Sequence, residues 1–445
     1  MQKTRMFHGG EDEMTWIRFL SEMADLIWSA PVVFLLLGVY LYISCRAGFP
    51  QRRVFRGLGA AFSGNRAVRR SLSVSLAAVL GVGNIVGVAM AISLGGPGAV
   101  FWCWLAGFAG MGVQYAECLC SLRHRQTEDL PGGPMVSLRA MGFRGSAWLY
   151  AAAAVLCGLT MGALIPANSI RTVLIPYGGN VWIVAIILAA LTALVLVGGA
   201  GRIFSFCIRV IPLLVLFYVA ACGAVLLLCR DAVGEAIRAI LTEAFSLPSA
   251  LAGTAGYGIG RAARWGVARG LFSSEAGLGT AGISAASADA EDPETQALGC
   301  ACQSVWDTMI LATLTGVTFV TAALSEGYGF GDPMLLARRA FSMIPLVGEW
   351  LLPVFLVVLG FSTIIGWYYI ARQAWLYLTG LRAGGFFALL WIVSAAAGVF
   401  LLTELAWTLS DLFSMLMLVP NLRMLLLMLR REPRVLPGKK AGENP

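Results

Sequence analysis

Two glycine-rich segments interrupt stretches of chain that are otherwise apolar enough to span a membrane. Residues 80–87 read Leu-Gly-Val-Gly-Asn-Ile-Val-Gly, and residues 273–281 read Ser-Ser-Glu-Ala-Gly-Leu-Gly-Thr-Ala. Glycine has no Cβ, so a helix can unwind there and let another group approach its backbone closely. The N–H and C=O groups that such a break frees are too costly to expose to lipid. Two breaks far apart in the sequence therefore predict a buried site at membrane depth, of the kind found in transporters built from two related halves.

Hydroxyl and carboxyl side chains inside apolar segments are the other candidates for chemistry. Ser362 and Thr363 are adjacent, and their oxygens suit a hard cation such as Na⁺, although they could instead bond to carbonyls of their own helix. Glu275 could accept the N–H groups freed by the second break or contact a ligand. Asp307 could relay protons, but we expect it to pair with a buried polar neighbour. Ionisable groups at membrane depth are functional candidates by default, and four fall there or close to it: Glu117, Glu275, Asp307 and Asp411.

The composition is that of a membrane protein. The chain has 445 residues, of which 58% are hydrophobic and 13% charged, with a mean hydropathy of +0.79, whereas a soluble protein carries roughly 25% charged residues. The net charge of +8 comes from arginines grouped in a few loops, which indicates membrane orientation and lipid contact, not nucleic-acid binding. The ten cysteines lack zinc-site spacing and are expected to pack as small apolar residues.

Eleven apolar runs predict an all-α polytopic membrane protein. They lie at about 24–45, 71–93, 98–122, 147–172, 181–199, 207–229, 262–288, 299–323, 350–377, 384–402 and 405–429, each near the length that crosses a bilayer. Arg-rich loops follow the first, third and last runs, which places those loops and the C-terminus in the cytoplasm and the N-terminus outside.

This topology leaves one extra N-terminal span before ten others. The ten divide into five at 71–229 and five at about 262–429, so the two repeats have inverted topology. The sequence thus predicts an extracytoplasmic tail at 1–23, a transmembrane domain at 24–429 and a basic cytoplasmic tail at 430–445. Residues 230–261, which are more polar, are expected to form a loop with short surface or re-entrant helices.

Seven motifs, in order, resemble those of one known family. They are Gly-Val-Gly-Asn-Ile-Val-Gly-Val-Ala at 81–89, Leu-Gly-Gly-Pro-Gly-Ala-Val-Phe-Trp at 94–102, Gly-Gly-Pro-Met at 132–135, Arg-Gly-Leu-Phe-Ser-Ser-Glu-Ala-Gly at 269–277, Asp-Thr at 307–308, Phe-Ser-Thr-Ile-Ile-Gly-Trp-Tyr-Tyr at 361–369 and Pro-Asn-Leu at 420–422. Over about residues 20–430 the chain resembles the alanine/glycine:cation symporters, the sodium:alanine symporter family. The resemblance implies a leucine-transporter-like fold with five-plus-five inverted repeats.

The resemblance also implies a substrate, a coupling ion and the residues that bind them. It predicts a secondary active transporter that imports a small neutral amino acid such as alanine or glycine with sodium. A zwitterion needs donors for its carboxylate, which N–H groups at a half-helix N-terminus supply, and acceptors for its ammonium, which freed carbonyls supply. The predicted substrate-binding residues are Gly81, Gly83, Asn84, Gly87, Ser274, Glu275, Gly277 and Trp367, and the predicted cation-binding residues are Val82, Asn84, Ser362 and Thr363.

Each of these assignments has a structural alternative. The glycines could simply allow close helix packing, because Gly83 and Gly87 have the small-xxx-small spacing. Asn84 could cap the broken backbone or face the ligand. Trp367 lies four residues after Thr363, on the same helix face, and could wall the cavity or be an ordinary packed tryptophan.

Three positions depart from the pattern of the family. Val82 stands where Thr is usual, Pro166 where Gln is usual and Ser274 where Asn is usual. Val82 and Pro166 remove polar groups near the expected site. These departures do not affect the predicted fold. They leave undecided which substrate is carried and whether sodium or protons drive its transport.

Two other classes of membrane protein fit less well. A membrane enzyme needs nucleophile–base pairs or metal ligands, but the only histidines are His8 and His124, and no metalloprotease-type motif occurs. A passive channel would usually carry a repeated filter sequence. We therefore expect a monomeric, multi-pass transporter of a bacterial cytoplasmic membrane that is not an enzyme, with sodium as coupling ion, no other cofactor and no catalytic residues. The alternative is a proton-coupled transporter of a different small amino acid.

Overall fold

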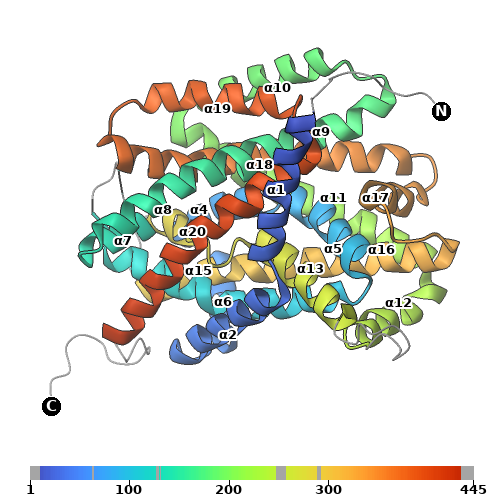
Figure 1. Cartoon of the computed structure of the whole chain (residues 1–445), viewed down its shortest axis with the longest axis horizontal. Helices are drawn as coiled ribbons and strands as arrows, with labels where there is room; N and C mark the ends of the chain where they lie inside the picture. The colour runs from blue at the N-terminus through green and yellow to red at the C-terminus, as the bar shows by residue number, and fades with distance from the viewer. Residues whose placement is uncertain are drawn as a thin grey trace.

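The structure is a computed structural model that describes residues 11–62, 65–126, 130, 132–246, 257–287 and 292–431, and its regular elements in these ranges are all helices (Figure 1). The α-helices are α1 (Glu11–Ile27), α2 (Ala30–Arg46), α3 (Val54–Phe62), α4 (Arg66–Val79), α5 (Val88–Gly95), α6 (Ala99–Arg123), α7 (Pro134–Ala140), α8 (Arg144–Cys157), α9 (Ile165–Leu174), α10 (Val181–Leu196), α11 (Gly199–Leu228), α12 (Arg230–Glu243), α13 (Tyr257–Ser274), α14 (Thr280–Ala286), α15 (Pro293–Ser304), α16 (Thr313–Glu326), α17 (Pro333–Ser342), α18 (Gly348–Thr379), α19 (Gly384–Gly398) and α20 (Thr403–Arg431). Three π-helical turns, η2 (Gly83–Gly87), η3 (Gly158–Leu164) and η6 (Val305–Ala312), and two 3₁₀ turns, η1 (Pro50–Arg53) and η4 (Ile175–Tyr177), connect some of them.

Each of the eleven predicted apolar runs lies mainly on helices in the described residues, and two of the runs, 71–93 and 262–288, contain the glycine-rich breaks. Six continuous helical segments of the described chain are long and apolar enough to cross a membrane, or eight if two bent helix pairs each count as one span. Val181–Leu196 and Gly384–Gly398 are apolar but shorter. The protein is thus an all-α polytopic membrane protein, while the count of eleven spans and the inverted repeats stay predictions.

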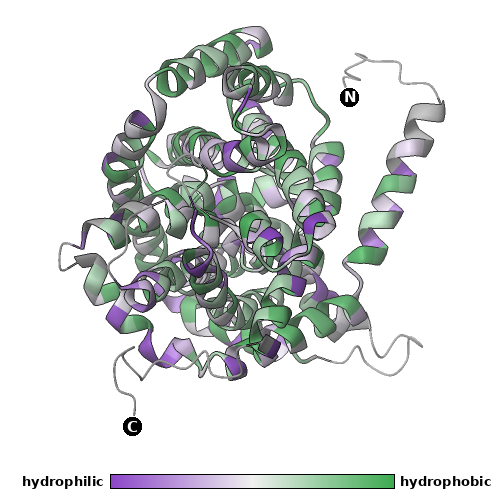
Figure 2. Cartoon of the chain, turned by 90° about the vertical axis from the view of Figure 1, so that its left-hand side faces the viewer, coloured by the Kyte–Doolittle hydropathy of each residue, from purple (hydrophilic) through white to green (hydrophobic). Residues whose placement is uncertain are grey.

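The outward faces of the bundle are apolar. Seen along many of the helices, the periphery is mostly hydrophobic (Figure 2). Large apolar side chains such as Ile186, Leu194, Leu216 and Leu227 are more than 60% exposed. A soluble protein rarely exposes such continuous apolar surface, so these faces fit contact with lipid.

Two segments outside the predicted spans also contain helices. Residues 11–27 form α1, which lies across the outside of the bundle over α20 (Figures 1 and 2), where the sequence suggested part of a tail. Within 230–261, the structure has α12 and the start of α13, as expected for short helices there. Residues 1–10, 247–256 and 432–445, which include most of the predicted basic tail, lie outside the described residues.

Helix α6 is the central element that positions the site. It packs against α13, α14 and α15, and its small residues allow close approach, since a Cβ at Gly110 would lie 2.7 Å from the Cβ of Ala276. The short helix α7 lies at one end of the bundle, and α12 and α17 lie at the other (Figure 1). The Arg-rich loops predict that the α7 end is cytoplasmic.

Candidate functional site

The first glycine-rich segment is a bend between two half-helices. The segments Ala67–Val79 and Gly83–Gly95 meet at 54°, and the π-helical turn η2 follows the bend. Helix α18 packs directly onto the break, because a Cβ at Gly81 would overlap the hydroxyl oxygen of Thr363. Glycine is thus required at Gly81 by close approach, and the sequence prediction of a break in this span is confirmed.

The second segment is a full interruption between α13 and α14. Its turn needs left-handed backbone, with φ of 90° at Gly277 and 80° at Gly279, which glycine adopts at little cost. Glu275 has φ 54°, a conformation that is uncommon for residues with a side chain. Such backbone strain persists only when the surroundings enforce it, and it is frequent at functional sites.

Buried side chains from other helices satisfy the polar backbone groups that this interruption frees. The amides of Gln114 and Gln303 donate to the Ser274 carbonyl at 2.8 and 3.0 Å. Three further donors each reach one carbonyl: Tyr40 to Ala276 at 2.6 Å, Asn421 to Gly277 at 2.7 Å and Tyr150 to Leu278 at 2.7 Å. Buried backbone groups require such partners, so these contacts fix the shape of the break.

Glu117 is part of the same support. Its Oε1 accepts the backbone N–H of Gly279 at 3.1 Å and the Asn421 amide at 2.6 Å. Its side chain is fully buried. Glu117, one of the four ionisable residues that the sequence placed at or near membrane depth, therefore holds the second break.

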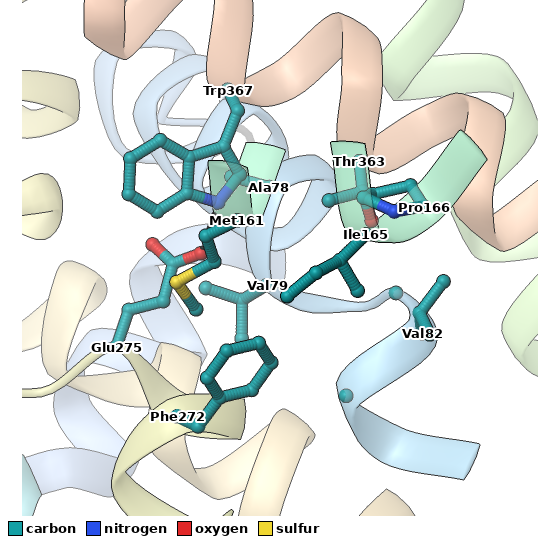
Figure 3. Close-up of a pocket in the computed structure, with 12 residues that line it drawn as sticks. Ala78, Val79, Val82, Met161, Ile165, Pro166, Phe272, Glu275, Thr363 and Trp367 are labelled. Atoms are coloured by element: carbon teal, nitrogen blue, oxygen red, sulfur yellow. Dashed lines mark hydrogen bonds between the residues drawn. The ribbon is translucent and has the colours of Figure 1, made fainter. Parts of the chain in front are cut away.

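The two breaks meet at one buried cavity (Figure 3). The space open to the centre of a water molecule is ≈ 20 Å³, enough for a water but not for an amino acid. Substrate entry thus requires the walls to move apart. Twelve residues line it: Ala78, Val79, Gly81, Val82, Gly83, Met161, Ile165, Pro166, Phe272, Glu275, Thr363 and Trp367.

Glu275 is the only charged side chain among the twelve. Its Oε1 accepts the indole N–H of Trp367 at 2.6 Å, and the indole lies over the carboxylate (Figure 3). Its Oε2 is buried without a hydrogen bond of good geometry, although the Thr280 hydroxyl lies nearby. A buried carboxylate oxygen with spare acceptor capacity is suited to a cationic group.

A second polar cluster lies between η2, α13 and η6. Asp307 accepts the Asn84 amide at 2.8 Å and the Thr308 hydroxyl at 2.8 Å. The Ser273 hydroxyl lies 3.0 Å from the Asn84 Oδ1 and 3.1 Å from the nearer Asp307 oxygen. All four side chains are buried, so Asp307 pairs with polar neighbours as expected.

The structure divides the predicted site residues into two groups. Gly81, Val82, Gly83, Glu275, Thr363 and Trp367 line the cavity, whereas Asn84, Gly87, Ser274, Gly277 and Ser362 do not. Asn84 belongs to the Asp307 cluster, and Gly277 lies in the supported turn. The hydroxyls of Ser362 and Thr363 both donate to the Leu359 carbonyl, at 2.8 and 3.0 Å, which is the alternative of bonding within the helix.

Some residues at the site were missed by sequence reasoning. The apolar walls Met161, Ile165 and Phe272 carry no signal that separates them from other buried residues. Ser273 lies next to the predicted Ser274, but nothing in the sequence says which of the two faces Asp307. Amides inside apolar helices, such as Gln114 and Gln303, would have been a usable signal.

Two of the three departures from the family pattern lie at the cavity. Val82 and Pro166 both line it, on one side of the site (Figure 3). Ser274 does not line it; its hydroxyl lies 3.4 Å from the backbone N–H of Ala276. The cavity therefore has apolar surface at two positions where the family usually has a hydroxyl and an amide.

Comparison with known proteins identifies the family. The model of the sodium:alanine symporter family matches residues 13–437. An uncharacterized transporter of Haemophilus influenzae is 35% identical over 423 residues, covering 92% of this chain and 93% of the relative. The sodium/alanine symporter AgcS of Methanococcus maripaludis is 31% identical over 439 residues, covering 93% and 95%. The probable sodium/glutamine symporter GlnT of Bacillus subtilis is 28% identical over 444 residues, covering 95% and 91%.

A solved structure shows the same fold. The crystal structure of MhsT in complex with L-phenylalanine has a TM-score of 0.58 and 15% identity, and the match covers 81% of this chain and 88% of MhsT. This likeness establishes a leucine-transporter-like fold. Together with the match to the family over nearly its whole length, it shows that this chain belongs to the sodium:alanine symporter family, whose members are membrane transporters of amino acids.

Proposed function

We propose that this transporter imports a small neutral amino acid by symport with sodium across a bacterial cytoplasmic membrane. The observation that carries the proposal is that the two chain breaks meet at one buried cavity, where Glu275 is the one carboxylate among the described lining residues. Broken helices that meet at membrane depth form the substrate and ion sites of transporters built from repeats.

The walls of the cavity favour a small, neutral side chain. The large side chains of Met161, Phe272 and Trp367 are among the twelve that line the ≈ 20 Å³ cavity. Trp367 is fully buried and held by its hydrogen bond to Glu275, so a large substrate would have to displace a fixed indole. None of the twelve described residues that line the cavity is cationic, which disfavours substrates with an acidic side chain.

Glu275 and the first break supply opposite ends of a zwitterion. The spare oxygen of Glu275 would accept the ammonium group, because a carboxylate is an acceptor of charged donors. Backbone N–H groups at the start of the second half of the broken helix, around Gly83, would receive the carboxylate. The proposed substrate-binding residues are therefore Gly81, Gly83, Glu275 and Trp367.

The Asp307 cluster supports coupling to a cation. An ionised carboxylate whose described partners are neutral donors is an uncompensated charge in the protein interior, which is costly. Sodium bound by oxygens of Asp307, Asn84 and Ser273 would neutralise it, because hard cations take carboxylate, amide and hydroxyl oxygens. Thr363, at the cavity beside the first break, offers a further hydroxyl for a cation.

Proton coupling is the second candidate, and a specific observation favours it. Glu117 and Glu275 each have one buried carboxylate oxygen without a hydrogen bond of good geometry. Either group could carry a proton in place of a sodium ion nearby. The two coupling modes predict different responses to imposed ion gradients.

Uptake into proteoliposomes tests the proposal. A panel of radiolabelled amino acids is offered with an inward gradient of sodium, of protons or of neither, with and without an inside-negative potential. We expect accumulation of a small neutral amino acid only with sodium and more of it with the potential. Each sodium ion gains about 2.3 kcal/mol per 100 mV, which corresponds to more than tenfold accumulation.

A matched pair of variants localises the coupling ion. Asp307→Asn should abolish the sodium dependence of uptake, because the carboxylate is lost. Asp332→Asn is the control: Asp332 is an exposed helix N-cap that accepts from Met334 and Leu335, and Asn caps helices equally well. Uptake that ignores sodium and follows a proton gradient would select the second candidate, and downhill flux without accumulation would reject both.

A further inference from the structure

Two open cavities lie between the same helices and share no lining residue with the substrate cavity. The first has a volume of ≈ 410 Å³, and the described residues that line it are all apolar. Its walls come from α9, α10, α11 and α18, and include Leu188 on α10, Val210 on α11 and Val358 on α18. Because these helices are apolar and their outer faces are exposed, the cavity opens toward the hydrocarbon region that we assign to lipid.

The second cavity, of ≈ 350 Å³, lies at the end of the same helices and is partly polar. It is bounded by the turn between α10 and α11, by α18 and by the first turn of α19. Arg372 on α18 lines it beside Tyr368. Gly384 also lines it, and a Cβ there would lie 3.5 Å from Nη2 of Arg372, so the guanidinium reaches the start of α19.

The two cavities follow one another along the bundle. On α11, Ile203 lines the polar cavity and Phe206 the apolar one, three residues apart, about one helical turn. On α18, Tyr368 and Phe361 are seven residues apart, about two turns. Helices α10 and α19 run side by side above α18 in Figure 1. We call the two cavities together the α10–α18 groove.

The charge of the groove is positive at one end only. Among the described residues that line the two cavities, Arg372 is the only charged one, and no described carboxylate forms an ion pair with it. Arg372 lies seven residues from the end of α18, at the end of the bundle that the Arg-rich loops predict to be cytoplasmic. Arginines near helix ends extend toward the membrane interface.

We propose that the α10–α18 groove binds an anionic phospholipid of the cytoplasmic leaflet. The headgroup phosphate contacts Arg372 in the polar cavity, and an acyl chain fills the apolar cavity between α10 and α18. Basic pockets between membrane helices on the cytoplasmic side bind anionic headgroups in this way. The acyl chain contributes binding energy by packing against the cavity wall. Its burial alone adds little, because the surrounding lipid tails are as apolar as the wall.

Native mass spectrometry of the purified protein in mixed micelles of phosphatidylglycerol and phosphatidylcholine tests this proposal. We expect the wild type to retain phosphatidylglycerol about fivefold more strongly than phosphatidylcholine, the scale of one arginine near a membrane surface. Arg372→Gln should remove that preference. Arg230→Gln is the matched control, because the Arg230 side chain is 81% exposed and lies on α12, at the other end of the bundle.

A substitution that fills the apolar cavity tests whether the acyl chain of the lipid lies there. Leu188→Trp fills the cavity and should lower retention of both lipids severalfold; Val358→Phe, from the opposite wall, repeats the test if the first variant does not elute as a single species. Equal retention of the two lipids by the wild type would overturn the proposal. So would an equal loss in Arg372→Gln and Arg230→Gln, or unchanged retention after the cavity is filled.

Discussion

Replacing Arg269 should destabilise the protein more than replacing its partner Asp411, although both belong to one buried ion pair. The guanidinium of Arg269, on α13, makes two hydrogen bonds to the Asp411 carboxylate on α20, at 2.7 and 3.2 Å. The side chains are 3% and 14% exposed. Three residues after Arg269, Phe272 lines the substrate cavity, so the pair lies one helical turn from the site.

The aromatic surroundings make the two partners unequal. The Arg269 guanidinium lies 5.5 Å from the ring centroid of Trp265, 5.7 Å from Phe272 and 4.9 Å from Trp407. Arg269→Ala leaves a carboxylate largely buried among these rings, which attract cations and not anions. Removing one member of a buried ion pair lowers the free energy of unfolding by about 3–5 kcal/mol.

Asp411→Asn leaves the guanidinium with the three rings and with an amide oxygen as acceptor. The expected decrease in the free energy of unfolding is about 1.5–3 kcal/mol, the scale of one hydrogen bond to a charged group. The double variant Arg269→Ala with Asp411→Ala should cost less than the sum of the two alanine variants, because the second change removes the unpaired carboxylate.

The free energy of unfolding in mixed SDS micelles, followed by circular dichroism, measures these losses. Glu294→Gln is the control, because the Arg53–Glu294 pair is more exposed, at 17% and 32%, and such pairs contribute about 0–1 kcal/mol. Equal losses for Arg269→Ala and Asp411→Asn, or strict additivity in the double variant, would refute the argument from the aromatic surroundings.

Three further predictions concern transport and are measured by uptake at equal protein level. Gly81→Ala should abolish uptake, because its Cβ would overlap the Thr363 hydroxyl. Gly87→Ala should leave most activity, because no atom beyond the adjacent residues and the backbone of its own helix lies within 4 Å of the added Cβ. Similar activities of the two variants would contradict the close approach at Gly81. Thr363→Ala should raise the sodium concentration for half-maximal uptake, and an unaltered value would exclude the hydroxyl as a ligand. Val82→Thr with Pro166→Gln should shift preference toward alanine and glycine, because each restored hydrogen bond contributes about 0.5–1.5 kcal/mol; an unchanged ratio of alanine uptake to that of the best native substrate would place both positions outside the selectivity site.

The positions of helices and breaks could be predicted from the sequence because their causes are local. Apolar length sets a span, and a glycine cluster within it sets a break, so both breaks were found at 80–87 and 273–281. The helix α1 was not predicted, because its mixture of polar and apolar residues resembles that of a tail until α20 is known to cover one face.

The partners across the site could not be predicted, because their contacts join distant parts of the chain. Asn84 and Asp307 are 223 residues apart, and Glu117 and Asn421 are 304 apart. Each was recognisable as a buried polar group, but which group it pairs with depends on how the helices pack. For the same reason, the sequence joined Asn84 to Ser362 and Thr363 in one cation site, whereas the structure places Asn84 with Asp307.

The two alternatives for Glu275, a structural role in the break and contact with a ligand, are compatible in this structure. One carboxylate oxygen is used structurally, as the acceptor of the Trp367 indole N–H. The other has acceptor capacity at the cavity. The strained backbone of Glu275 is held by the surrounding break, whose carbonyls are bound by side chains of other helices. That rigid support allows a single residue to position the tryptophan wall and to present a negative charge at the site, so a change in one role should alter the other.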